Sequence, residues 1–203
     1  MTRRTFRRAI GPVVALLLLP ATSHAHLVNT GLGPFYDGVS HFVFTPEDVL
    51  PALALALLAG QRGSRTGRYA LFALPLSWLL GGLVGLAVPK MSDAPALTAV
   101  SFLALGGLVA TQARLRPEWV SGLAAVLGLV HGYVNGSAMS QAKLGTLGLV
   151  GIVSTLFVVV GLAAAMVVAI RVPWGRIAVR VAGSWIAAVG LLLLGWSLRG
   201  TTG

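Results

Sequence analysis

The sequence predicts an all-α protein, a bundle of about six transmembrane helices that follows a cleaved signal peptide. The chain is 56% hydrophobic and only 10% charged, whereas a soluble domain has about 25% charged residues. Its apolar segments also approach the roughly 20 residues that a helix needs to cross a bilayer. The expected spans are 40–60, 69–88, 95–112, 119–136, 145–170 and 177–198.

The first 25 residues are typical of a secretory signal peptide. Several arginines precede an apolar core over 9–20, and the small residues of Ser23-His24-Ala25 suit a cleavage site. Residues 26–203 then form a single membrane domain. Cleavage after Ala25 would leave His26 as the N-terminus, where the α-amine and the imidazole together could bind a divalent metal. If cleavage falls elsewhere, His26 is an ordinary loop residue.

The basic residues predict the orientation in the membrane. The net charge is +10, but these residues lie in short loops between apolar segments, which argues against nucleic-acid binding. Cytoplasmic loops are enriched in Lys and Arg, so we expect both ends of the mature chain to be extracytoplasmic. The loops then expected inside carry Arg62, Arg65, Arg68, Arg114, Arg116, Arg171, Arg176 and Arg180, and those outside carry Lys90, Lys143 and Arg199.

Two other features of the composition bear on the interior. The chain has no cysteine, so disulfides, thiolate metal sites and thiol catalysis are excluded. Glycines recur four residues apart, which allows membrane helices to approach closely. We interpret three such pairs as packing contacts: Gly81 with Gly85, Gly128 with Gly132, and Gly132 with Gly136.

Three of the five acidic residues lie within twelve positions of each other, beside a histidine, at the start of the first span. They are Asp37, Glu47 and Asp48, and the histidine is His41. Ionisable groups at membrane depth are costly and usually mark a substrate or ion path. The same residues also suit a helix start, because acidic side chains favour the first turn of a helix.

Two geometries are compatible with this segment. Thr45 is a good N-cap and Pro46 a good first helical residue, so the helix would begin at Pro46, inside the membrane, after a partly irregular segment that carries Asp37 and His41. Alternatively, one continuous helix would place Asp37, His41, Thr45 and Asp48 on one face. Either arrangement gathers oxygen and imidazole ligands suited to a divalent first-row metal.

His131 and Asn135 form a second polar pair, near the end of the fourth span. Their spacing of four residues places them on one helix face, at the same outer side of the membrane as the start of the first span. We therefore expect both of them to meet His41 and Asp48. A purely structural alternative is that His131 only forms a hydrogen bond with a neighbouring helix.

These residues resemble the HupE/UreJ family of bacterial inner-membrane proteins, which is associated with nickel uptake for hydrogenase and urease. The early His26, then Gly38 and His41, match the first family motif, with Glu47 in place of its Asp and Asp48 in place of its second His. In the later motif His131-Gly132 and Gly136 match, while Asn135 replaces a His and Ala138 a Glu. This exchange of imidazole for oxygen leaves the choice of metal open.

The resemblance implies a multi-pass inner-membrane permease for a divalent transition metal, with Ni²⁺ as substrate, that supplies metalloenzyme-maturation partners. No bound cofactor is expected, and the protein is not expected to be an enzyme. The metal site would comprise His26, Asp37, His41, Glu47, Asp48, His131 and Asn135. Two alternatives remain open: a non-transporting accessory subunit whose polar cluster holds helices together, and an intramembrane metal-dependent hydrolase using Glu47 or Asp48 with His131.

Overall fold

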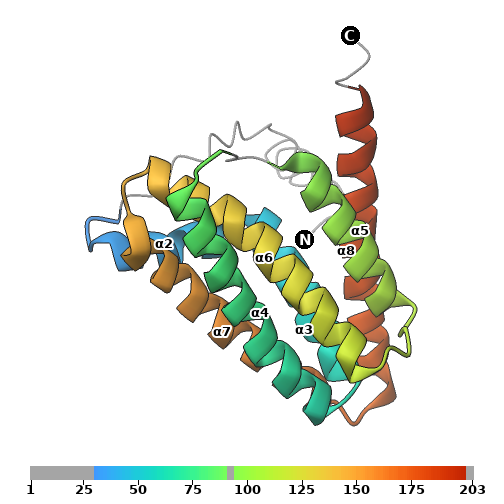
Figure 1. Cartoon of the computed structure of the whole chain (residues 1–203). Helices are drawn as coiled ribbons and strands as arrows, with labels where there is room; N and C mark the ends of the chain where they lie inside the picture. The colour runs from blue at the N-terminus through green and yellow to red at the C-terminus, as the bar shows by residue number, and fades with distance from the viewer. Residues whose placement is uncertain (1–29, 91–93, 200–203) are drawn as a thin grey trace, which may run out of the picture.

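The computed structural model describes residues 30–90 and 94–199 of the chain, and this part is entirely helical. The predicted signal peptide and His26 lie outside the described residues. The seven described helices, labelled in Figure 1, are α2 (Pro34–Phe44), α3 (Pro46–Gln61), α4 (Ser64–Ala87), α5 (Pro95–Ala110), α6 (Pro117–Gln141), α7 (Gly145–Ala169) and α8 (Pro173–Arg199). The predicted fold class is confirmed, and each of the six predicted apolar segments falls on helix.

Fewer than six of these helices stand out as spans by length and apolar character. Ser64–Ala87, Gly145–Ala169 and Pro173–Ser197 are long and apolar enough to cross a membrane, and α2 with α3 would make a fourth, bent span. Helix α5 is apolar but has only 16 residues. Helix α6 has 25 residues but carries His131 and Asn135. The prediction of six spans is therefore not confirmed.

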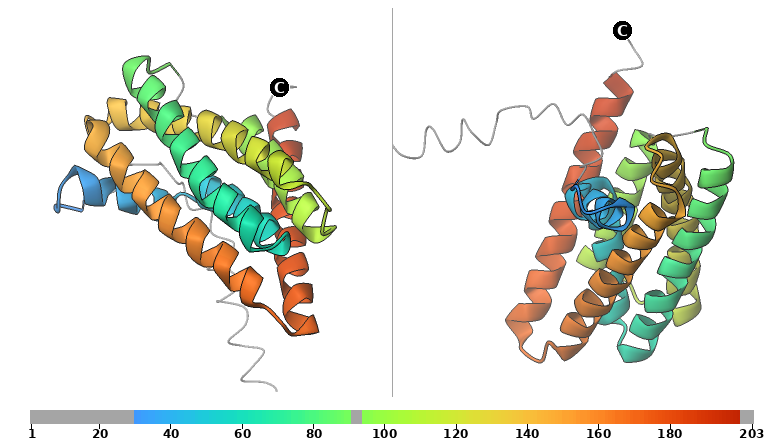
Figure 2. Two further views of the ribbon diagram at one scale, coloured as in Figure 1. Left: turned by 60° about the horizontal axis from the view of Figure 1, so that its bottom comes forward. Right: turned by 90° about the vertical axis from the view of Figure 1, so that its left-hand side faces the viewer.

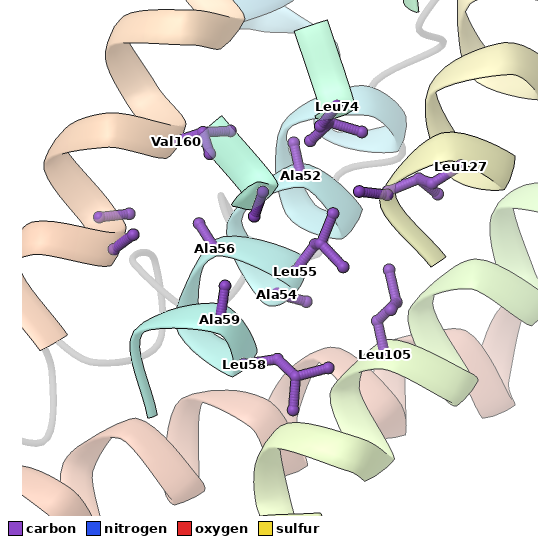
Figure 3. Packing of buried hydrophobic residues seen from close by; sticks show 14 of the residues in the cluster. Ala52, Ala54, Leu55, Ala56, Leu58, Ala59, Leu74, Leu105, Leu127 and Val160 are labelled. Carbon is purple, nitrogen blue, oxygen red and sulfur yellow. The ribbon is translucent and has the colours of Figure 1, made fainter. Parts of the chain in front are cut away.

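Helix α3 lies at the centre of the bundle. It contacts each of the other six described helices, and most side chains of its middle section are fully buried. Figure 3 shows these side chains enclosed by Leu74 of α4, Leu105 of α5, Leu127 of α6 and Val160 of α7. A helix that is apolar all round belongs in an interior. The buried residues of α3 include Ala52, Ala54, Leu55, Ala56, Leu58 and Ala59.

Glycines bring α4 and α6 into backbone contact. A Cβ at Gly81 would overlap the carbonyl oxygen of Leu129, and one at Gly132 would overlap that of Trp78. Gly85, Gly128 and Gly136 are equally crowded by backbone atoms across this interface. Only a residue without a side chain permits this approach, so the prediction that these glycines pack helices together is confirmed.

The first span is broken at Thr45, as one of the two predicted geometries requires. Thr45 has extended backbone angles (φ −106°, ψ 92°), because a residue that precedes proline avoids the helical region. Helices α2 and α3 consequently meet at an angle of 72°. In the right-hand view of Figure 2, α2 is seen nearly end-on while α7 and α8 run along the page.

Two details of this prediction were wrong. The segment before the break is helix α2 rather than irregular chain, because close contacts of Gly38 with Gly148 and of Gly151 with Phe35 pack it against α7. The Thr45 hydroxyl also does not cap α3. It donates backward to the carbonyl oxygen of His41 instead.

The connections separate into two ends of the bundle. The α3–α4, α5–α6 and α7–α8 connections lie at the lower end of Figure 1, and the α6–α7 turn lies at the opposite end. The arginines of the loops expected inside therefore share one end, which we call the basic end. It comprises Arg62, Arg65, Arg68, Arg114, Arg116, Arg171, Arg176 and Arg180.

Candidate functional site

The centre of the candidate site is a buried carboxylate, that of Asp48 in the first turn of α3. Its Oδ1 lies 3.1 Å from Nδ1 of His131, and its Oδ2 accepts a 2.9 Å hydrogen bond from Nδ2 of Asn135. The three side chains are 5%, 3% and 3% exposed, respectively. Helices α3 and α6, far apart in the sequence, thus meet at one polar cluster inside an apolar bundle.

The hydrogen bonds fix the arrangement of the imidazole. An ionised carboxylate only accepts hydrogen bonds, so Nδ1 of His131 carries the proton that points to Asp48. The other ring nitrogen, Nε2, lies 3.2 Å from the hydroxyl of Ser101 on α5. In a neutral imidazole this nitrogen accepts from the hydroxyl. Helix α5 therefore also joins the cluster through Ser101.

Aromatic rings close one side of the cluster. The indole of Trp78 lies over the His131 imidazole, with ring centroids 5.5 Å apart and planes inclined by 33°. Phe42 of α2 packs edge-on against the same indole. Both side chains are fully buried. They hold His131 in place and keep the cluster in a setting of low dielectric constant, where its hydrogen bonds are strong.

Local sequence explains how these groups come together. The break at Thr45–Pro46 places Asp48 in the first turn of α3, where the positive end of the helix dipole favours a carboxylate. The contact of Gly132 with the Trp78 backbone brings α6 against α4 at the level of His131. Asn135, one turn further along α6, is held by a second hydrogen bond from its Nδ2 to the carbonyl oxygen of His131.

His41 lies at the edge of this cluster. It is half-buried on α2, and its imidazole is within electrostatic range of Asp48 and Glu47 and interacts with the Asn135 side chain. The Oδ1 of Asn135 is buried and has no hydrogen bond of standard geometry within the described residues. The structure therefore brings together Asp48, His131 and Asn135, with His41 at the edge of the cluster.

The other predicted ligands lie apart from the cluster. The Asp37 carboxylate accepts hydrogen bonds of 2.7 and 2.6 Å from the backbone nitrogen and hydroxyl of Thr30. Glu47 is exposed, because it precedes Asp48 by one residue and so faces another side of α3. Within residues 30–90 and 94–199, no three His, Asp or Glu side chains are grouped so that they could hold a metal ion.

Sequence reasoning missed two members of the cluster, Ser101 and Trp78. Ser101 is one of two buried hydroxyl residues, with Thr98, at a spacing of three in α5. That spacing puts both on one face of an otherwise apolar helix, which was the available signal. Trp78 carries no signal of its own, because a tryptophan in an apolar span is ordinarily packing material.

The cluster has the order of groups of a serine hydrolase, in which a serine, a histidine and an aspartate are linked by hydrogen bonds. However, Ser101 is only 9% exposed. Two cavities in the described part of the chain, one between α4 and α7 and one at the basic end, are lined by other residues. The buried arrangement can hold charge and protons inside the bundle.

Comparison with known families decides where this chain belongs. The family model described as HupE / UreJ protein matches residues 14–193. The chain belongs to the HupE/UreJ family. The predicted resemblance is therefore confirmed, and the family together with the apolar helices identifies a membrane protein linked with metal transport. No curated protein and no solved structure gave a match.

Two polar segments of the matched range, far apart in the sequence, come together in the structure. The first motif segment, around His41 and Asp48, and the second, around His131 and Asn135, lie far apart in the matched range. In the structure they form a single buried cluster through the hydrogen bonds of Asp48. Asp48 of α3 and His131 and Asn135 of α6 therefore belong to one cluster, which Ser101 of α5 joins.

Proposed function

We propose that this HupE/UreJ protein is a secondary permease for a divalent transition-metal cation, with nickel as its substrate. The observation that carries the proposal is the buried Asp48 carboxylate, bound to an imidazole and an amide beside a 72° break in a membrane segment. A carboxylate buried in a membrane segment has a high energetic cost, and such groups usually mark a functional site. Broken helices next to polar groups are typical of ion sites in transporters.

The cluster suggests how the cation would be held. Asp48 would offer carboxylate oxygens, and His41 and His131 would offer imidazole nitrogens, which suit nickel. For His131 to bind through Nδ1, its proton must move to Nε2. The Ser101 hydroxyl, which can accept as well as donate, would then accept from Nε2. The His131 imidazole would thus stay neutral when Nδ1 binds the metal, because its proton moves to Nε2 and remains on the ring.

A small rearrangement completes this proposed site. Asp48 and His131 are hydrogen-bonded to one another, and His41 interacts with Asn135 from the neighbouring helix α2. A change at the α2–α3 break would bring the His41 imidazole closer to Asp48. Asn135 would support Asp48, while Asp37, Glu47 and, if it is the mature N-terminus, His26 would attract cations at the outer entrance. The protein would sit in the inner membrane with both ends outside and supply metalloenzyme maturation within the cell.

Calorimetric titration of purified protein with nickel, cobalt, copper and zinc tests the site directly. We expect nickel binding by the wild type and its loss in both His41→Ala and Asp48→Asn. Glu118→Gln is the matched control, because Glu118 is an exposed acidic residue in the first turn of α6, outside the cluster. If the wild type binds none of the four metals, the permease proposal is wrong.

The second candidate function is that of a membrane accessory subunit. It is favoured by one observation: Asp48, His131, Asn135 and Ser101 already bind one another across α3, α5 and α6. Such a network can simply fix the helices relative to each other. In that case Asp48→Asn would lower stability, and no metal would bind to the wild type.

A further inference from the structure

A polar cavity lies at the basic end of the bundle, at the opposite end of α3 from Asp48. It has a volume of about 340 Å³ and is lined by the last turn of α3, the α3–α4 connection, the α5–α6 loop, the end of α7 and the start of α8. Its polar lining consists of Gln61, Arg62, Gln112 and Arg176. No acidic residue lines it. Neither the proposed metal path nor the family motifs involve these residues.

Two polar atoms of this lining are buried without a partner among the described residues. One is Nε of Arg62, a donor that cannot lose its charge, and the other is Oε1 of Gln61, an acceptor. The amide orientation of Gln61 is fixed, because its Nε2 donates to the carbonyl oxygen of Val109 at 3.1 Å. Buried polar groups ordinarily have partners. Both atoms are covered by neighbouring protein atoms. Once the two side chains turn toward the cavity, a ligand that accepts from Arg62 and donates to Gln61 would satisfy both.

The electrostatic setting favours an anion. Within residues 30–90 and 94–199 no arginine forms a salt bridge with a carboxylate. At the basic end the one described acidic side chain is the exposed Glu118. Arg62 and Arg176 are thus free to bind an anion, and phosphate oxygens match the fork of donors on a guanidinium.

The remaining lining indicates that the cavity lies at the level of the lipid headgroups and that a lipid supplies the phosphate. Val167 and Val168 of α7, with Ile170 directly after it, form an apolar side, which suits the hydrocarbon part of a lipid better than a free ion. Trp119 and Trp174, which are 69% and 71% exposed, lie near the same end. Tryptophans gather at the level of lipid headgroups, and basic pockets between membrane helices bind anionic headgroups.

We propose that the cavity lined by Arg62 and Arg176 binds a ligand that has both a phosphate group and a hydroxyl group, such as the headgroup of phosphatidylglycerol. The phosphate accepts from the two arginines, and the hydroxyl donates to Oε1 of Gln61. Inorganic phosphate offers the same chemistry in its protonated form. The lipid also contacts the apolar wall of α7, and it ties the ends of α3, α7 and α8 together.

Lipid binding to the purified protein in neutral detergent tests this site, with phosphatidylglycerol and phosphatidylcholine as probes and native mass spectrometry as the readout. We expect phosphatidylglycerol to bind more tightly than phosphatidylcholine, and Arg62→Gln/Arg176→Gln to weaken it about 30-fold, because each arginine near an anionic lipid contributes about fivefold. The matched control Arg68→Gln/Arg116→Gln removes the same charge from exposed positions outside the cavity. It should change the affinity less than threefold.

Further measurements keep the outcome decisive. Arg176 is exposed on the surface of α8, so Arg176→Gln alone should fold and weaken binding about fivefold even if the double variant does not fold. Binding of radiolabelled inorganic phosphate that is lost in the same variants, with no binding of phosphatidylglycerol, would identify free phosphate as the ligand. If neither probe binds, or if the control variant loses as much affinity as the cavity variant, the proposal is wrong.

Discussion

Asp48 and His131 are 83 residues apart in the sequence, yet Oδ1 of Asp48 and Nδ1 of His131 lie 3.1 Å apart in the core. This contact joins the central helix α3 to α6. It also places a carboxylate where no Lys or Arg neutralises it within the described residues. Its charge is instead stabilised by the His131 imidazole, the Asn135 amide and the N-terminus of α3.

We expect Asp48→Asn to abolish metal uptake while the protein remains folded. The asparagine keeps one oxygen that can accept from His131 or Asn135, but it has no charge to hold a dication. Asp48→Leu should also abolish uptake and destabilise the protein, because the donors of His131 and Asn135 lose their acceptor at a cost of about 1–3 kcal/mol for each group. Nickel uptake into proteoliposomes and thermal unfolding in detergent measure the two effects.

Glu118→Gln serves as the control for this prediction, since it also removes one negative charge but lies outside the cluster. It should leave uptake and unfolding temperature close to those of the wild type. Uptake by Asp48→Asn at the wild-type rate would show that the carboxylate is structural.

We expect Gly132→Ala to destabilise the bundle by about 1–3 kcal/mol, the usual cost of overpacking a core. The new Cβ would overlap the carbonyl oxygen of Trp78, and a helix backbone cannot move aside as a flexible side chain can. Gly122→Ala on the same helix is the matched control. Gly122 is exposed with open space around its Cα, so alanine there should be neutral or stabilising by up to about 1 kcal/mol.

Thermal unfolding in detergent compares the two glycine variants. Because Trp78 covers the His131 ring, Gly132→Ala should also change the tryptophan fluorescence, and Gly122→Ala should not. Equal unfolding temperatures for the two variants would mean that the α4–α6 interface is looser than the structure shows.

The course of the main chain was largely predictable from the sequence. Apolar segments marked the helices, Thr45–Pro46 marked the break, and glycines at a spacing of four marked the α4–α6 contact. Each of these signals is local, because it depends on backbone preference or on the helical repeat. The meeting of His41, Asp48, His131 and Asn135 was predicted from their common side of the membrane, which is a property of topology.

Other features depended on tertiary contacts and were not predictable. Before the break, α2 forms a helix because α7 packs against it through Gly38 and Gly151. Asp37 was expected in the metal site, but Thr30 supplies its hydrogen bonds. The direction in which a carboxylate turns depends on which donors the fold brings near it. No pattern in α2 alone contains that information.

The bend between α2 and α3 should depend on Pro46. In Pro46→Ala the preceding Thr45 can become helical, so the two helices can straighten into one. With helices of 1.5 Å rise per residue, loss of a 72° bend would lengthen the distance between the far ends of α2 and α3 by about 7 Å. His41 would then move away from Asn135, and we expect metal uptake to fall.

Spin labels at Tyr36→Cys in α2 and at Ser64→Cys, three residues beyond the end of α3, report this change by pulsed electron paramagnetic resonance. Both positions are exposed, and the chain has no other cysteine. Pro95→Ala is the control. Pro95 is also the first residue of a helix, α5, but it is separated from the α2–α3 bend by α3 and α4. A distance that is unchanged in Pro46→Ala would show that packing of α2 against α7, rather than the proline, sets the bend.

Substitution and chemical labelling of Ser101 test whether the protein is a transporter or a hydrolase. If Ser101 were a nucleophile activated by His131 and Asp48, Ser101→Ala would abolish activity, and a fluorophosphonate probe would label the wild type at this residue. We expect no labelling, because the serine is buried and lines neither of the two cavities described above. Ser101→Ala should instead leave Nε2 of His131 without a partner, lower stability by about 1 kcal/mol, and slow uptake without abolishing it. Ser121→Ala, at a part-buried serine bonded only to its own helix, is the control for a lost hydroxyl. Specific labelling of Ser101 would contradict the permease proposal and favour the hydrolase alternative.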